Sequence, residues 1–444
     1  MGKTYITPTK VEALRIFDYD RVPALYFFIL EVMMKISGVD VEYLKQKYNT
    51  PLYIYDEEHI IKNMNGYLNN FKSNKFNTEV LYASKAFCVK EMIRLVKQAG
   101  MSLDVVSLGE LKTALAVDFD MSKVYFHGNN KSVEEITCAL ENNVGTIVVD
   151  NYMELVTLEN LCQKFQKKCN ILIRLNVGVE AHTHKFIVTA HVDSKFGVLY
   201  ESIEYNNMMD LIRNSNYINF KGFHSHIGSQ IFDLQAFSAA LEKLINICKN
   251  FSQPLILNIG GGFGVKYVDE DKPIPFDVVS KTLIDECEKS LEKNNIQIEK
   301  LCIEPGRSIV AEAGYTLYTI GGIKKTPNKL YYFIDGGMTD NIRPALYQAK
   351  YNADIIGKED MLKSQIVTVA GKCCESGDII IENIPLPKAI KGDLLITYTT
   401  GAYGYSMSSN YNKALTPAVV FVNDGKDKLV CRRQTIDELL EREL

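Results

Sequence analysis

The chain of 444 residues is 46% hydrophobic and 23% charged, with a formal net charge of −4 at pH 7. This composition is typical of a globular protein that is long enough for a large core and for two or three domains. The near-neutral charge and the lack of a basic block argue against nucleic acid as the main partner.

The start of the chain predicts neither a membrane anchor nor a secretory signal. Its most apolar stretch, Val22 to Ile36, is about fifteen residues long and contains Glu31, whereas a spanning helix needs about 20 apolar residues. Met1 to Asp20 lacks the basic, then apolar, then small order of a signal. We therefore expect a buried segment, no membrane partner and a cytoplasmic protein. Ten scattered cysteines without a CxxC pair predict reduced thiols.

From about Asp56 to about Arg307, short apolar runs alternate with segments of helical period. Plausible helices include Val89 to Ala99, Val133 to Asn142, Met153 to Phe165 and Asp233 to Asn250. Eight runs predict strands: Glu79 to Tyr82, Ser102 to Val106, Val124 to His127, Thr146 to Val149, Asn170 to Asn176, Phe220 to Ile227, Leu255 to Ile259 and Lys300 to Glu304. Eight strand-helix units over this length predict a parallel (β/α)₈ barrel, spanning residues 58–310.

Beyond Ala311 the pattern changes to short β-branched and aromatic runs with glycine turns. This pattern predicts an antiparallel β-domain over residues 311–444, with a hairpin around Asn423, Asp424 and Gly425. We expect residues 1–57 to join this domain in part, so that the barrel is inserted between the two pieces. The predicted fold class is therefore α/β plus β.

Nearly every predicted strand of the barrel ends in a polar or glycine-rich cluster. Because functional residues of such barrels lie at the carboxyl ends of the strands, we expect these clusters to surround one mouth. In chain order they are Ser84-Lys85, Ser107, His127 to Asn130, Asp150, Arg174 with Asn176, His226 to Gln230, Gly260 to Gly262 and Glu304 to Arg307.

The first cluster places Lys85 at the end of an apolar strand. A buried ammonium is costly without a partner, and a lysine in an apolar pocket loses its proton more easily and becomes an imine-forming nucleophile. Taken alone, however, a lysine at a strand end is more often a surface residue.

Three later clusters suit a phosphorylated aromatic cofactor. Gly260 to Gly262 predict a loop whose backbone N–H groups can approach an anion, although three glycines alone usually mark a tight turn. Glu304 can keep a ring nitrogen protonated, and Arg307 can hold a phosphate or carboxylate. His226 offers an aromatic face and Ser229 a hydroxyl near a helix start.

Pyridoxal 5′-phosphate is the one cofactor that explains these clusters together. A metal site is the weaker hypothesis, because His182 and His184 stand two apart on an apparent loop without paired carboxylates nearby, and we predict no metal.

The C-terminal domain adds polar clusters that a β-domain does not need for folding. Arg343 and Tyr347 are four apart and would share one face of a helical turn. Cys374 and Glu375 lie in a glycine turn, and Tyr403 lies among glycines. Loop packing explains each of them equally well. Together, one cation with acids and hydroxyls suits a small zwitterion.

These motifs resemble, in order and spacing, those of the diaminopimelate decarboxylases. That family belongs to the fold-type III pyridoxal-phosphate enzymes, together with ornithine and arginine decarboxylases and alanine racemase. The resemblance runs from about Gly38 to about Asn412. It is carried by YASKAF, LDVVS, HGNNKS, AHTHKF, SKFGV, HSHIGSQ, NIGGGFGVKY, EPGRSIV, DGGMTDNIRPALYQAKY, CCESGD and GAYGYSMSSNYN.

The resemblance implies decarboxylation of meso-2,6-diaminopimelate to L-lysine and CO₂, the last step of lysine biosynthesis. Lys85 would hold the cofactor as an imine, and Cys374 would return the proton. The cysteine loop would reach the barrel of a second subunit in a homodimer with shared active sites. The cofactor would contact Asp104, His226, Ser229, Gly260, Gly261, Gly262, Glu304, Gly306, Arg307 and Tyr403. The substrate would contact Arg307, Arg343, Tyr347, Glu375 and Tyr403.

Departures from the family pattern are few. Leu108 stands where a second glycine is usual, Val177-Gly178 replaces an Asn-Pro-Gly-like run, and Lys372-Cys373 precedes Cys374 where Pro-Leu is commoner. None of these removes a proposed catalytic group, although the last can alter the loop that delivers Cys374.

Three other functions remain open from the sequence. A sister decarboxylase of ornithine, arginine or a carboxynorspermidine-like substrate would share the cofactor site, but Arg343 and Glu375 favour a substrate whose remote end bears both a carboxylate and an ammonium. A racemase would pair its lysine with a tyrosine base. A non-catalytic relative usually loses the lysine or the thiol, and this chain keeps both.

Overall fold

A closed parallel barrel forms the larger part of the molecule in the computed structural model, which describes residues 34–179 and 193–444. The barrel is closed by the pairing of β10 with β8, and all of its pairings are parallel. This confirms the predicted (β/α)₈ barrel. Its strands are β4 (Asn77–Ala83), β5 (Ser102–Val105), β6 (Val124–Phe126), β7 (Thr146–Val149), β8 (Cys169–Asn176), β10 (Ile218–His224), β11 (Leu255–Asn258) and β12 (Ile298–Ile303). A short strand, β9 (Val198–Leu199), pairs in parallel with the end of β8.

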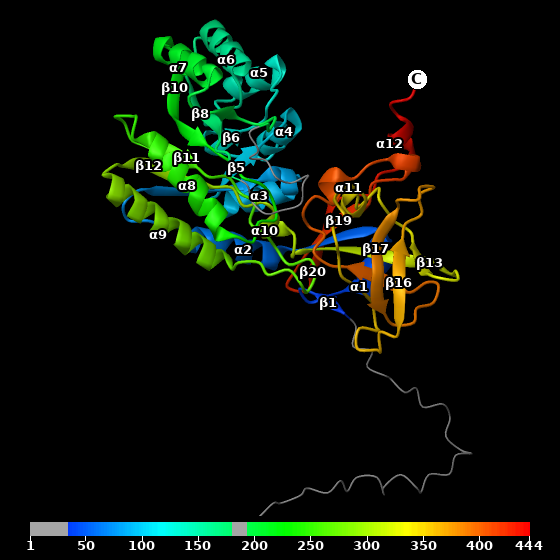
Figure 1. Cartoon of the computed structure of the whole chain (residues 1–444). Helices are drawn as coiled ribbons and strands as arrows, with labels where there is room; N and C mark the ends of the chain where they lie inside the picture. Colours follow the sequence, from blue (N-terminus) through cyan, green and yellow to red (C-terminus); the bar gives the residue numbers. More distant parts are fainter. Residues whose placement is uncertain (1–33, 180–192) are drawn as a thin grey trace, which may run out of the picture.

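Helices surround the barrel, as Figure 1 shows in blue to green. Most of them begin with a side-chain cap, for example Ser132 and Asn151, which accept hydrogen bonds from the first-turn N–H groups of Glu135 and Glu154. Their apolar faces pack on the outside of the barrel. These helices are α2 (Glu57–Asn70), α3 (Lys90–Ala99), α4 (Leu108–Leu115), α5 (Val133–Glu141), α6 (Tyr152–Phe165), α7 (Ile203–Asn214), α8 (Leu234–Cys248) and α9 (Phe276–Asn294), followed by the short α10 (Arg307–Val310).

The second domain, at the right of Figure 1, is built on a sheet of β-strands. The predicted hairpin is present, because Asn423 pairs with Lys426 across Asp424 and Gly425. The sheet is mixed rather than purely antiparallel, since β14 pairs with β16 in parallel. Its C-terminal strands are β13 (Gly314–Lys325), β14 (Leu330–Ile334), β15 (Ala353–Ile355), β16 (Gln365–Ala370), β17 (Ile379–Leu386), β18 (Leu394–Thr397), β19 (Ala418–Asn423) and β20 (Lys426–Cys431), with helices α11 (Arg343–Tyr347) and α12 (Ile436–Leu440).

A segment before the barrel completes this sheet. Strand β3 (Leu52–Asp56) pairs antiparallel with β13 and parallel with β19, which is the second parallel pairing in the domain. The hairpin of β1 (Lys35–Ile36) and β2 (Val39–Asp40) and helix α1 (Val41–Tyr48) precede it. Leu52 and Ile54 of β3 pack in the core of this domain with Leu317 and Val420. The barrel is therefore inserted between two segments of the chain that together form the second domain.

Two sequence predictions concern residues outside the described ranges. The apolar stretch from Val22 lies almost wholly before residue 34, and His182 and His184 lie between the two ranges. A search of the described helices found none whose length and hydrophobicity suit a membrane crossing.

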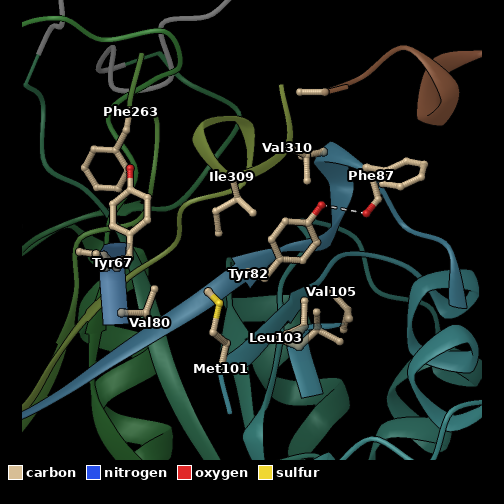
Figure 2. Close-up of a cluster of buried hydrophobic side chains, with 14 of the residues drawn as sticks. Tyr67, Val80, Tyr82, Phe87, Met101, Leu103, Val105, Phe263, Ile309 and Val310 are labelled. Carbon is tan, nitrogen blue, oxygen red and sulfur yellow. Dashed lines mark hydrogen bonds between the residues drawn. The ribbon is translucent and has the colours of Figure 1, made fainter. Parts of the chain in front are cut away.

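A buried cluster shown in Figure 2 fixes the end of β4. Tyr82 points outward from the strand and is fully buried among Val80, Met101 and Leu103. Its hydroxyl donates a hydrogen bond of 2.9 Å to the carbonyl oxygen of Phe87. Because this bond spans the turn after β4, it closes that turn and positions the residue inside it, Lys85.

Candidate active site

A pocket of about 790 Å³ opens where the carboxyl ends of the barrel strands meet loops of the second domain. The prediction that the polar strand ends gather at one mouth is confirmed in part. Clusters that line the pocket are represented by Lys85, His127, Arg174, His226, Gly261 and Glu304. Ser107 and Asp150 are not in this lining, and Ser107 caps helix α4 instead. Of the predicted site residues, those that line the pocket are Lys85, Asp104, His226, Ser229, Gly261, Gly262, Glu304, Gly306, Arg307, Arg343, Tyr347 and Tyr403. Gly260 is buried directly behind this lining, and Cys374 and Glu375 lie elsewhere.

Lys85 sits in a single 3₁₀ turn, Ser84 to Ala86, and its side chain is exposed to the pocket. The turn is held from three sides. Besides the Tyr82 bond, the carbonyl of Ala86 accepts a 2.8 Å hydrogen bond from the N–H of Tyr403. Gly306 packs so closely that a Cβ there would lie 2.9 Å from Ala83. The amine therefore projects from a rigid base on the barrel.

The floor of the pocket holds two buried carboxylates, Asp104 and Glu304. Burial raises the pKa of Asp104, and the neighbouring His127 opposes that rise. Burial would also raise the pKa of Glu304, but His127 and His224 outweigh it and hold that pKa well below its ordinary value. Oδ1 of Asp104 is buried and has no hydrogen-bond partner among the described residues. This carboxylate oxygen can therefore accept a hydrogen bond from a group that enters the pocket.

The glycine loop after β11 forms a close-fitting wall. A Cβ at Gly261 would lie 2.0 Å from the carbonyl oxygen of Glu304, and one at Gly262 would lie 2.2 Å from that of Gly228. The N–H of Gly260 already donates to Oδ1 of Asn258 at 2.9 Å, and the N–H of Gly261 donates to Nδ1 of His226 at 3.3 Å. The loop therefore orients the His226 ring as well as shaping the wall.

His226 has the electrostatics of a neutral aromatic face. Burial lowers its pKa well below the ordinary value, and the nearby cations Lys85 and Arg174 lower it further. The imidazole is therefore uncharged at neutral pH, which suits stacking on a flat cofactor ring.

Two buried guanidinium groups lie beyond the glycine loop. Arg307 donates to the hydroxyl of Tyr267 at 2.6 Å and to that of Ser229 at 2.8 Å. Arg343 donates to the hydroxyl of Tyr351, and its guanidinium carbon lies 4.9 Å from the centre of the Tyr267 ring. Throughout residues 34–179 and 193–444, neither arginine pairs with a carboxylate. Nε of Arg307 is also buried without a partner there.

The loop that carries Cys374 and Glu375 does not reach this pocket. Both residues are exposed, and the N–H of Cys374 donates to Oδ1 of Asn412 at 2.9 Å. The base of the loop is tied down by buried Asp378, whose carboxylate accepts hydrogen bonds from the N–H groups of Met338 at 2.6 Å and Cys373 at 2.7 Å. The thiol is therefore presented outward on a fixed loop.

Several residues at the site were not assigned a role from the sequence. His127, His224 and Asn258 surround Glu304, Arg174 stacks at 4.6 Å on the ring of Phe196, and Tyr267 lies between the two arginines. His127 and Arg174 were visible as polar strand ends. His224 precedes His226 by two residues, and the period of a strand predicts that both side chains point to one side.

Together, His127, His224 and Glu304 also have the composition of a divalent-metal site, with their ligand atoms within 4.8 Å of one another. They are the one such group that was found in the described part of the chain. His224 lies within hydrogen-bonding distance of Glu304, and His127 makes a close polar contact with it, so a polar cluster without a metal accounts for the same geometry.

The sequence and the fold of this chain match those of known proteins. The family model for the pyridoxal-binding domain of pyridoxal-dependent decarboxylases matches residues 57–311. Diaminopimelate decarboxylase of Bacillus methanolicus is 47% identical over 407 residues, which are 90% of this chain and 94% of that protein. The chain belongs to the diaminopimelate decarboxylase family. This confirms the resemblance drawn from the order of the motifs.

Other members of the family agree in sequence and fold. Diaminopimelate decarboxylase of Bacillus subtilis is 44% identical over 93% of this chain and 95% of its own. The crystal structure of diaminopimelate decarboxylase from M. jannaschii in co-complex with L-lysine matches with a TM-score of 0.84 at 32% identity, covering 93% of this chain and 98% of that chain. The fold of this family, a barrel joined to a β-domain, is therefore also the fold of this chain.

Proposed function

We propose that this protein removes CO₂ from meso-2,6-diaminopimelate to give L-lysine, with pyridoxal 5′-phosphate as cofactor. One observation supports this choice of substrate. Arg307 and Arg343 are both buried, and neither has a carboxylate partner in the described chain. A buried cation without a counter-ion is costly, so a ligand that supplies anions is favoured. A phosphate and a remote carboxylate supply them, whereas ornithine, which has no second carboxylate, would leave Arg343 unpaired.

The residues present fit this cofactor. Lys85, His226 and Glu304 all line the pocket. Lys85 would hold the aldehyde carbon of the cofactor covalently, His226 would cover its ring, and Glu304 would pair with the ring nitrogen. Ser229, Arg307 and the wall formed by Gly261 and Gly262 would hold the phosphate. The unpaired Oδ1 of Asp104 would accept a polar hydrogen of the bound group. The bound cofactor supplies an electron sink for the pair of electrons left when a carbon–carbon bond breaks.

The remaining chemistry belongs to the protein. The bond to the departing carboxylate breaks, CO₂ leaves, and the same carbon must then receive one proton. We propose Cys374 as the donor of that proton and Glu375 as the partner of the remote ammonium. Both are exposed on the loop tied by Asp378. A shared active site, in which this loop enters the pocket of a second copy of the chain, would bring them to the substrate.

The test of the proposed function is CO₂ release by the purified, cofactor-loaded protein. Meso-diaminopimelate, L-ornithine, L-arginine and D- and L-alanine are assayed side by side. We expect release from diaminopimelate alone, with L-lysine as the product. Release of CO₂ from ornithine or arginine instead would support a decarboxylase but refute diaminopimelate as its substrate. Interconversion of the alanines without CO₂ would instead indicate a racemase.

A further inference from the structure

The carboxylate of Glu304 receives polar contacts from residues at the ends of three different strands. Nδ2 of Asn258 donates to Oε1 at 2.7 Å. Nε2 of His127 lies 3.0 Å from the same oxygen, a close polar contact whose angle is not that of a hydrogen bond. Nε2 of His224 lies 3.3 Å from Oε2. All four side chains are buried, so water does not compete for these contacts. Both oxygens of the carboxylate therefore face nitrogen donors.

The two imidazoles form one unit beneath the pocket. Their rings meet edge to face with centres 4.8 Å apart. His127 also lies 3.7 Å from Oδ1 of Asp104, and so stands between the two carboxylates of the floor. His127 follows β6 and His224 ends β10, so the barrel itself sets the distance between them.

The protonation state of His224 supports a donor role. Burial lowers the pKa of His224 to about 4, so the ring is neutral at neutral pH. A neutral imidazole carries its single hydrogen on one nitrogen. Nδ1 has no partner in the described chain, whereas Nε2 faces Glu304. Placing the hydrogen on Nε2 satisfies the carboxylate and adds no charge to the floor.

A carboxylate that accepts several N–H hydrogen bonds is a weak base. When such a group shares a proton with a ring nitrogen, the proton resides on the nitrogen. We infer that His127 and His224 are positioning residues that keep Glu304 ionised and thereby keep the ring nitrogen of the cofactor protonated. This inference rests on the cofactor part of the proposed function, but it is independent of which amino acid is the substrate.

The test is a direct measurement of the ring nitrogen. Each histidine is changed separately to Phe, which keeps a flat ring and removes the N–H, and to Gln, which keeps an N–H at a similar reach. A His→Met variant at each position fills the space with a flexible side chain, in case the Phe variant does not fold. The proteins are loaded with pyridoxal phosphate labelled with ¹⁵N in the ring, and the nitrogen resonance is recorded without substrate.

We expect the wild-type resonance at the position of the protonated ring. His224→Phe and His127→Phe should move it toward the neutral ring, weaken cofactor binding about tenfold and lower turnover about ten- to a hundredfold. In the Gln variants, the nitrogen resonance should lie close to its wild-type position, because Gln restores an N–H donor. Glu304→Gln marks the position of the fully uncoupled ring, and His59→Phe is the matched control, because His59 lies on α2 outside the pocket.

An unchanged resonance in folded, cofactor-loaded Phe or Met variants would overturn the inference. Stoichiometric binding of Zn²⁺ that excludes the cofactor and requires both histidines would also overturn it, because the cluster would then be a metal site. A protein that binds the cofactor with a protonated ring but releases no CO₂ from diaminopimelate would refute the substrate alone. Failure of the wild type to bind pyridoxal phosphate would refute both proposals.

Discussion

The two sides of the pocket differ in how complete they are within one chain. On the barrel side, Lys85, Asp104 and Glu304 all lie in the pocket, and Glu304 has hydrogen-bond partners in His224 and Asn258. On the side of the second domain, Arg343 lies in the pocket, but the loop with Cys374 points outward into solvent. The barrel side is thus complete within one chain, whereas the loop proposed to deliver a proton lies outside its own pocket. The proposed shared active site, in which a second copy supplies this loop, would account for the difference.

The largest effects are expected from the two groups that would act on the reacting carbon. Lys85→Ala and Cys374→Ala should each lower turnover by about 10⁴-fold, because each removes a group that acts as part of a unit. Lys85→Ala should also abolish covalent attachment of the cofactor, which borohydride reduction and mass spectrometry of the intact chain would detect. Lys90→Ala, at the exposed start of α3, is the matched control and should behave as wild type.

Mixing these two inactive proteins tests whether sites are shared. After random exchange of subunits in an equal mixture, half of the dimers are mixed, and each contains one intact site if Cys374 acts in the partner's pocket. Activity should then return to about a quarter of wild type. If the mixture stays inactive while native mass spectrometry shows mixed dimers, Lys85 and Cys374 of the same chain act in one site. That result would refute the proposed sharing of active sites.

On the β-domain side, Arg343→Ala should raise the KM for diaminopimelate about a hundredfold, with a smaller change in kcat. The reason is that a buried charge pair with the remote carboxylate is worth about 3 kcal/mol. Cofactor affinity should change little, because the proposed cofactor contacts other than Tyr403 lie on the barrel. Arg213→Ala, a change on the exposed face of α7, is the control. An unchanged KM would assign the remote carboxylate to another group.

A change at Asp378 should have a smaller effect on the side of the second domain, because Asp378 holds the loop that carries Cys374. Asp378→Asn replaces one acceptor by a donor that faces the N–H of Met338 or Cys373, so the loop should loosen. We expect kcat to fall about tenfold, with cofactor binding intact, since a hydrogen bond to a charged group is worth about 1.5–3 kcal/mol. Asp360→Asn, at an exposed position, is the control. Equal kcat values in the two variants would show that this tie does not position Cys374.

The barrel and most of its pocket were predictable because the signals are local. Each apolar run became a strand, and most of the strands are followed within two residues by a pocket residue, as for Lys85 and Glu304. Non-local facts were not predictable. The parallel pairing of β3 with β19 joins segments more than three hundred residues apart, and no local pattern encodes it. Likewise, no spacing shows that His224, rather than His226, touches Glu304, or that Cys374 faces away from its own pocket.

Tyr267 lies between the barrel side and the β-domain side of the pocket. It therefore allows a test of whether the two sides are coupled. Burial would raise the pKa of Tyr267, but Arg307 of the barrel and Arg343 of the second domain outweigh it and lower that pKa. Between the lowered value and the ordinary value near 10, the unfolded chain holds the proton longer, so the free energy of unfolding should gain a positive contribution as pH rises. Below this window the contribution vanishes.

Tyr267→Phe should remove that contribution, which urea unfolding at a series of pH values would measure. It should also remove one early phenolate signal from the absorbance titration of the native protein and raise the KM for diaminopimelate a few-fold. Tyr152→Phe, at the first residue of α6, is the matched control. Arg343→Ala alone should move the early titration back toward the ordinary range, because one of the two cations is lost. If that variant leaves the titration unchanged, Arg343 does not act on Tyr267, and the two sides of the pocket are not coupled through this residue.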